Sequence, residues 1–149
     1  MKNLSIIFSL LVLFFVASCK KDDTTTPTRA KKDILVSKTW IIFDVTGSGL
    51  TGYNRNTEVG KNVYELGKVT LIFNVDGTVT GTDNNGTALA AKWTLSTDEA
   101  KINITGSKIT GVDGEKTILV LTETNFNIQG MVTLPNIGTV DAIIKFIAK

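Results

Sequence analysis

The sequence predicts an all-β fold: a single eight-stranded antiparallel barrel of the up-and-down type, with a β-sandwich as the alternative. Three observations predict it. Apolar and polar residues alternate in short runs, as they do along a strand whose side chains point to opposite faces. Turn residues interrupt these runs at regular intervals. No segment keeps the period of a helix beyond one turn. An up-and-down barrel is favoured because closure removes the exposed edges of a sheet.

The clearest hairpin covers residues 69–82, where two alternating runs meet at Asp76 and Gly77. We expect a two-residue turn of type I′, because Asp-Gly adopts positive φ at both central positions at little steric cost. In that register one face of the first strand carries four apolar side chains, namely Val69, Leu71, Phe73 and Val75.

The other strands follow from the same alternation. They are expected at residues 40–46, 89–95, 101–105, 117–121, 126–132 and 139–147. The residues from Ile34 onward could form a single helical turn before the first strand. The last strand is apolar on both faces, since Ile143 and Ile147 lie opposite Ile144 and Phe146. An apolar patch on the outside of the fold would mark an interaction surface.

Residues 50–68 form the longest stretch without a strand pattern. We interpret it as a loop, of which residues 63–66 could be helical or an extra strand. A loop of this length inside a compact domain is uncommon and often functional. Tyr53 and Tyr64 lie in this stretch and are candidates for contact at the mouth of the barrel.

The N-terminus has the features of a secretory signal peptide. Lys2 is followed by residues 4–16, which are apolar except for two serines. This run of 13 residues is shorter than the roughly twenty that span a membrane as a helix. The run ends at Ala17, Ser18 and Cys19, which resembles the lipobox of bacterial lipoproteins. The resemblance implies that residues 1–18 are removed and that Cys19 carries acyl chains such as palmitate. An ordinary signal peptide with an incidental Cys is the alternative.

Residues 19–33 are polar and contain no large apolar side chain after Cys19. They cannot bury enough surface to offset the entropy of ordering, so we expect a flexible tether before a domain at residues 34–149. Lys20 after the Cys argues against retention at the inner membrane, by resemblance to lipoprotein sorting rules. Residues 21–23 (Lys-Asp-Asp) also look like the surface-export signal of Bacteroidetes lipoproteins, with a solvated linker as the alternative. The expected location is the outer membrane or the cell surface.

The composition excludes several classes of function. The chain has no His, one Cys and a formal net charge of +2. Most nucleophile–base pairs and most zinc sites therefore have no residues to build them. We expect no catalytic residue, metal or cofactor, and a protein that is not an enzyme. Basic residues are scattered rather than interleaved with aromatics, so no nucleic-acid partner is expected. The sequence does not indicate an oligomeric state.

Several short motifs carry a family resemblance. They are residues 38–40 (Lys-Thr-Trp), 73–78 (Phe-Asn-Val-Asp-Gly-Thr), 92–95 (Lys-Trp-Thr-Leu) and 118–122 (Ile-Leu-Val-Leu-Thr). With them, the chain from about Ile34 to Lys149 resembles the lipocalin-like domains of Bacteroidetes lipoproteins. The resemblance implies an eight-stranded barrel with a cup for a small molecule, and it implies no defined ligand.

Two functions are expected from these features. The first is a lipid-anchored envelope protein that binds a small apolar ligand in the barrel, behind the loop at 50–68. The candidate ligand-binding residues are Trp40, Tyr53, Tyr64, Phe73, Trp93 and Phe126. The alternative is an interaction module for a protein or a glycan, in which these aromatics simply fill the barrel. An eight-stranded barrel is wide enough for either arrangement.

Overall fold

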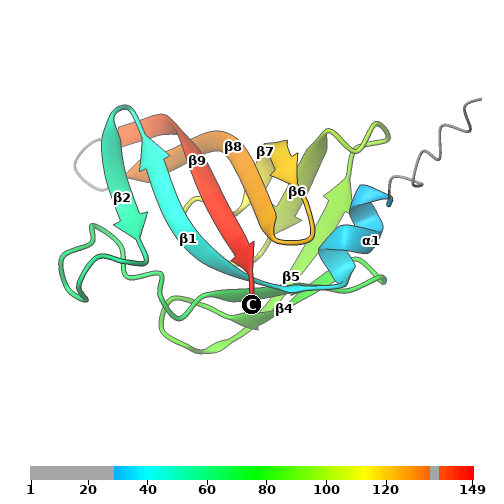
Figure 1. The fold of residues 1–149 in the computed structure, drawn as a ribbon, viewed down its shortest axis with the longest axis horizontal. Coiled ribbons are helices and arrows are strands. Elements are labelled where there is room, and N and C mark those ends of the chain that lie inside the picture. The colour runs from blue at the N-terminus through cyan, green and yellow to red at the C-terminus, as the bar shows by residue number, and fades with distance from the viewer. Residues whose placement is uncertain (1–28, 135–137) are drawn as a thin grey trace, which may run out of the picture.

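A computed structural model describes residues 29–134 and 138–149. The predicted signal peptide, Cys19 and most of the predicted tether lie outside the described residues. Within the described ranges the chain forms one short helix and nine strands, all paired antiparallel (Figure 1). None of the helical residues described there belongs to a helix long and apolar enough to cross a membrane.

The elements follow one another in simple order. In chain order they are α1 (Lys31–Val36), β1 (Thr39–Gly47), β2 (Leu50–Asn54), β3 (Thr70–Phe73), β4 (Thr78–Thr82), β5 (Ala88–Leu95), β6 (Lys101–Thr105), β7 (Gly114–Leu121), β8 (Asn125–Leu134) and β9 (Gly138–Ala148).

The sheet closes on itself. From β3 to β9 each strand pairs with the next one along the chain, and β1 pairs with both β3 and β9. These eight strands form a closed up-and-down barrel, and β2 is an additional strand alongside β1 (Figure 1). The predicted barrel is thus confirmed, and the fold is lipocalin-like. Inward positions alternate with outward ones, as the burial of every second residue along β5 shows.

β1 pairs with two strands, β3 and β2, along the same edge. Its first residues pair with β3 and its last residues pair with β2. Arg55 covers the gap between them, because its backbone N–H donates to Phe43 O at 2.9 Å and its Nε donates to Ile42 O at 3.2 Å. Its guanidinium also donates to Gly67 O. The carbonyls of Ile42 and Phe43 therefore have donors, and the ladder of β1 continues through Arg55.

The extra strand β2 lies within the stretch that the sequence predicts as a loop. Tyr53 of β2 pairs with Val45, and both side chains are buried. Residues 63–66, where the sequence allows a helix or an extra strand, form neither. Instead, the N–H of Tyr64 donates to Gly52 O at 3.1 Å and Asn62 Oδ1 accepts from Asn54 N at 2.9 Å. The loop thus covers part of the outer edge of β2.

The β3–β4 turn differs from the predicted type I′ turn. Its hydrogen bond runs from Gly77 N to Asn74 O, which makes Val75 and Asp76 the central residues. Of these four residues only Gly77 has positive φ, at 84°. This is the three-residue hairpin loop that ends in a left-handed Gly. Asp76 stabilises it by accepting from the N–H and the hydroxyl of Thr78. Val75 is therefore 71% exposed and does not share the buried face.

Both ends of the barrel are closed by the chain itself. At one end, which we call the α1 end, Leu35 is fully buried and its carbonyl accepts from Trp40 Nε1 at 3.0 Å. At the opposite end, the far end, Leu66 and the β6–β7 loop residues Ile109 and Val112 are buried in the same core cluster. In Figure 1, α1 lies at the right and the far end at the left.

We expect Gly81→Ala to destabilise the barrel by about 2–5 kcal/mol. Gly81 has φ of 135°, and a Cβ there would lie 2.1 Å from Thr70 O in the adjacent strand. Gly60→Ala is the matched control: its φ is 86°, and a Cβ would meet nothing within 4 Å. Gly60→Ala should lower the free energy of unfolding by only about 1–2 kcal/mol, which is the cost of the left-handed conformation for a residue with a Cβ. Urea unfolding of both variants measures the difference, and equal losses would contradict the close approach of β3 and β4.

Candidate functional site

An aromatic cluster fills the α1 end of the barrel. Phe126 is its centre, because its ring lies 5.5 Å from that of Trp40, 5.9 Å from that of Phe73 and 5.1 Å from that of Phe146. Phe73 also meets Trp93 edge to face at 5.3 Å. The rings come from β1, β3, β5, β8 and β9, and tilted or edge-to-face pairs add about 0.5–1.5 kcal/mol each beyond burial.

The structure brings together four of the six sequence-predicted ligand residues, but in the packed core. Trp40, Phe73, Trp93 and Phe126 are all buried. Aliphatic side chains from the same strands and from β4 and β6 fill the barrel around them, among them Ile42, Leu71, Val79, Ile104, Ile128 and Ile144. The aromatics that could have lined a cup are therefore packed against the core.

The other two predicted residues lie at the far end. Tyr53 is buried beneath the loop, and its hydroxyl lies 3.4 Å from the position that a Cβ of Gly67 would take. Burial raises the pKa of the Tyr53 phenol above its ordinary value. Tyr64 is half-buried, and its hydroxyl donates to Thr133 O of β8 at 3.5 Å. Both side chains help to close the far end.

Several hollows open onto the surface of the molecule. Four of them have volumes of about 280 to 640 Å³ and are lined by turn residues, loop residues and strand residues, and of the six candidates only Trp93 borders one. That one, the α1 hollow, has a volume of about 420 Å³ and lies between α1, the β3–β4 turn and the β5–β6 turn. Its lining residues are Lys32, Val75, Asp76, Gly77, Trp93, Thr94, Leu95, Ser96, Thr97 and Glu99.

A buried lysine is a feature that sequence reasoning missed. Lys116 of β7 is 4% exposed and points inward beside Ile118. Gly130 on β8 leaves room for it, because a Cβ there would lie 2.6 Å from Lys116 Cδ. Its Nζ donates to Asp113 O at 2.7 Å. Desolvation lowers the pKa of Lys116, and the nearby Asp113 carboxylate partly opposes this. The alternation of Lys116 with Ile118 was the signal that could have found it.

A second buried charge lies on the outside of the barrel. Asp44 is 6% exposed and accepts from Lys145 Nζ at 3.0 Å and from Asn54 Nδ2 at 3.3 Å. These contacts join β9, β1 and β2 across the outer face. Each oxygen of the carboxylate has a partner, so the burial is compensated by hydrogen bonds.

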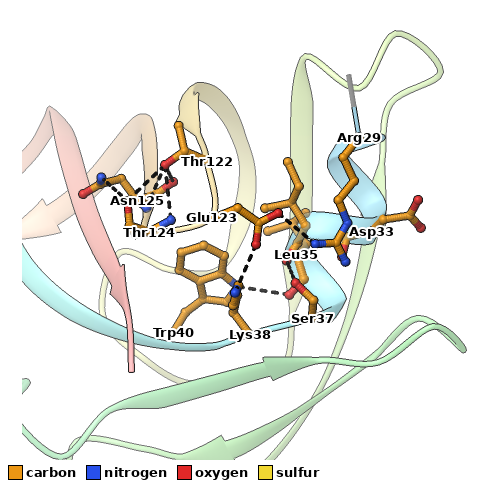
Figure 2. Close-up of polar contacts among 11 residues, drawn as sticks. Arg29, Asp33, Leu35, Ser37, Lys38, Trp40, Thr122, Glu123, Thr124 and Asn125 are labelled. Carbon is orange, nitrogen blue, oxygen red and sulfur yellow. Dashed lines mark hydrogen bonds and ion pairs between the residues drawn. The ribbon is translucent and has the colours of Figure 1, made fainter. Parts of the chain in front are cut away.

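An ion-pair cluster holds the start of the described chain against the barrel (Figure 2). Glu123, in the β7–β8 turn, accepts from Arg29 at 2.8 Å and pairs with Lys38 at 3.0 Å. The hydrogen bond from Lys38, followed by that from Arg29, lowers the pKa of Glu123. Arg29 also donates to Asp33 O at 3.0 Å. Residues 29–33, which the sequence places in the flexible tether, thus contact the barrel, and α1 begins at Lys31.

The outer face of β9 carries the predicted isoleucines, but they do not form an exposed apolar patch. Ile143 and Ile147 are half-buried, and Met131 on β8 is 59% exposed. In the described ranges, no three His, Cys, Asp or Glu side chains gather closely enough to hold a metal ion.

No protein-family model matches the chain, and no curated protein matches it significantly. The lipocalin-like assignment therefore stands on the architecture of the barrel alone.

We expect Phe126→Ala to destabilise the protein by about 3–5 kcal/mol, because it removes the ring at the centre of the aromatic cluster and leaves a cavity. An apolar cavity of this kind binds xenon or benzene. Denaturant unfolding measures the loss, and xenon binding followed by NMR measures the new cavity. Phe126→Leu, which leaves a smaller void, is the control and should lose less. If the unmutated protein took up as much xenon as Phe126→Ala, the cavity would already be present and the core would not be solidly packed.

We expect Lys116→Met to remove a pH dependence of stability. The pKa of Lys116 is lowered in the folded state, so between that pKa and the unfolded value of about 10.4 the unfolded chain binds more protons. Stability therefore rises with pH across this window in the unmutated protein, and the Met variant lacks that rise. Urea unfolding at several alkaline pH values checks the difference between the two proteins. Lys92→Met, at an exposed position of β5, is the control and should keep the rise.

Proposed function

We propose that this chain is a lipid-anchored protein of the outer membrane or cell surface whose solid-packed barrel serves as a protein- or glycan-interaction module. One observation carries the choice between the two expected functions. The interior is filled by the aromatic cluster around Phe126, while the hollows lie outside. Recognition then uses the outer surface and the loops.

Binding of a small apolar ligand in the cup has less support. A ligand at the α1 end would have to displace rings that contact one another at 5.1 to 5.9 Å. At the far end it would have to displace Leu66, Ile109 and Val112 from the core. Each displacement would remove buried apolar contacts that stabilise the fold.

The outer face supports the interaction role. Ile143 and Ile147 lie half-buried on β9, and Met131 lies exposed on the neighbouring β8. Polar residues separate them, since Lys145 lies between the two isoleucines and Met131 pairs with Asp141. Accessible apolar side chains of this kind can still contact a partner. The proposal assigns no catalysis, in keeping with a sequence that holds no His and a single Cys.

The anchor is supported by the sequence before the barrel. A basic residue, an apolar run, small residues and the single Cys occur in the order of a lipoprotein signal peptide. Stable anchoring takes more than one acyl chain, and a lipoprotein Cys carries several.

We expect Cys19→Ser to release the chain from membranes. Without its thiol the chain cannot be acylated, and the remaining tether is polar. Membrane fractionation and the mass of the N-terminal peptide measure the two effects. Ser18→Ala is the control, because it keeps a small residue before Cys19 and should remain anchored. A Cys19→Ser variant that is still acylated and membrane-bound would contradict the assignment.

The interaction role is tested by crosslinking in cells. A photoreactive residue at Ile143 should give one discrete adduct that protease or glycosidase treatment removes, whereas the same residue at Lys92 should not. Native mass spectrometry of the acylated chain, after phospholipids have been exchanged for detergent, should show no stoichiometric apolar ligand. A stoichiometric apolar ligand, together with no adduct at Ile143, would favour the cup instead.

A further inference from the structure

The α1 hollow combines unpaired charges of both signs. Lys32 has no hydrogen-bond or ion-pair partner among residues 29–134 and 138–149. Asp76 uses one carboxylate oxygen to accept from Thr78, at 3.0 Å from the N–H and 2.7 Å from the hydroxyl. Glu99 uses one oxygen to accept from Lys31 N at 3.1 Å. The second oxygen of each carboxylate has no partner in the described part of the chain. One ammonium and two carboxylate oxygens are thus available to a ligand.

The two acidic residues and the one basic residue of the α1 hollow lie on its lining together. The hydrogen bond from the Thr78 hydroxyl is the largest of the effects that lower the pKa of Asp76. A simple cation would leave Lys32 unmatched, and a simple anion would face two carboxylates. A zwitterion satisfies both signs at once, because its positive group meets the carboxylates and its negative group meets Lys32.

The α1 hollow also has an apolar border. Val75 at its rim is 71% exposed, and Leu95 is half-buried in its wall. An exposed Val beside a charged recess suits a ligand with a polar head and an apolar tail. The volume of about 420 Å³ is within the range of small-ligand sites.

We propose that the α1 hollow binds the phosphoethanolamine headgroup of a membrane phospholipid, with the ammonium at Asp76 and Glu99 and the phosphate at Lys32. The inference rests on the lipid anchor proposed above. Nine residues, 20–28, separate Cys19 from Arg29, and an extended residue spans at most about 3.6 Å. The anchor therefore holds the α1 hollow within reach of the bilayer surface.

The anchor also makes weak headgroup binding sufficient. A tethered site meets its ligand at an effective concentration in the millimolar range when the tether is short. A headgroup site with millimolar affinity would thus be substantially occupied. Occupancy would fix the orientation of the barrel, with the α1 end toward the membrane and the far end directed away from it.

The test uses the full acylated chain in nanodiscs of phosphatidylcholine, with or without phosphatidylethanolamine. Ethanolamine carries three N–H donors and choline carries none, so the carboxylates distinguish the two. We expect hydrogen exchange of residues 94–99 to slow several-fold only when phosphatidylethanolamine is present. Lys32→Gln and Glu99→Gln should abolish the slowing, and Lys92→Gln, outside the α1 hollow, should retain it.

A second arm separates the headgroup from the bilayer and from the anchor. The chain in detergent micelles is titrated with glycerophosphoethanolamine, and NMR shifts of residues 94–99 report binding. We expect about tenfold weaker binding by Lys32→Gln, as for loss of one hydrogen bond to a charged group. Equal protection in both nanodiscs, or protection that survives both variants, would overturn the proposal. If the soluble headgroup binds but hydrogen exchange in nanodiscs does not slow, the α1 hollow does not take its ligand from the bilayer. The mass of the N-terminal peptide reports separately on whether the anchor exists.

Discussion

The fold depends on the contacts that Phe126 makes with three other rings. Trp40, Phe73 and Phe146 belong to β1, β3 and β9, strands that are far apart in the sequence. Closing a barrel from hairpins requires the first and last strands to meet, which costs the entropy of a long loop. The aromatic cluster offsets that cost at the place where β1 meets β9, because its rings become buried only when the barrel is closed.

A filled interior leaves the outer surface as the part of the barrel that a ligand or partner can reach. With the core closed by Leu35 at one end and by Leu66, Ile109 and Val112 at the other, the groups still available to partners are the turns, the loops and the outward side chains. The unpaired charges of the α1 hollow and the apolar residues of β8 and β9 belong to this set. They lie on different parts of the molecule, so a membrane contact and a partner contact need not compete.

The barrel itself could be predicted because burial on one face imposes a period of two, which β5, β6 and β9 display clearly. β2 was missed because its pattern is interrupted: Gly52 falls at an irregularity in the β1–β2 register, and only four of its five residues pair with β1. The turn at Asp76 was misassigned because its geometry depends on hydrogen bonds to Thr78, which the Asp-Gly pair does not reveal.

The candidate site could be predicted only in part. Among the six predicted aromatic residues the sequence identified members of the core, but it could not show whether they surround a void. The charges of the α1 hollow converge from three separate segments, which no local pattern can indicate.

The position of the Arg29–Glu123–Lys38 cluster gives the molecule a mechanical property. A pull on the chain from its N-terminal side first loads the Arg29–Glu123 ion pair, then passes through α1 to the Lys38–Glu123 pair at the start of β1. The hydrogen bonds of β1 to β3 and β9 are perpendicular to that force. They are loaded in shear and must break together, whereas a strand pulled from its side would unzip one bond at a time. Tension applied on the N-terminal side of β1 therefore has to break these hydrogen bonds as a group.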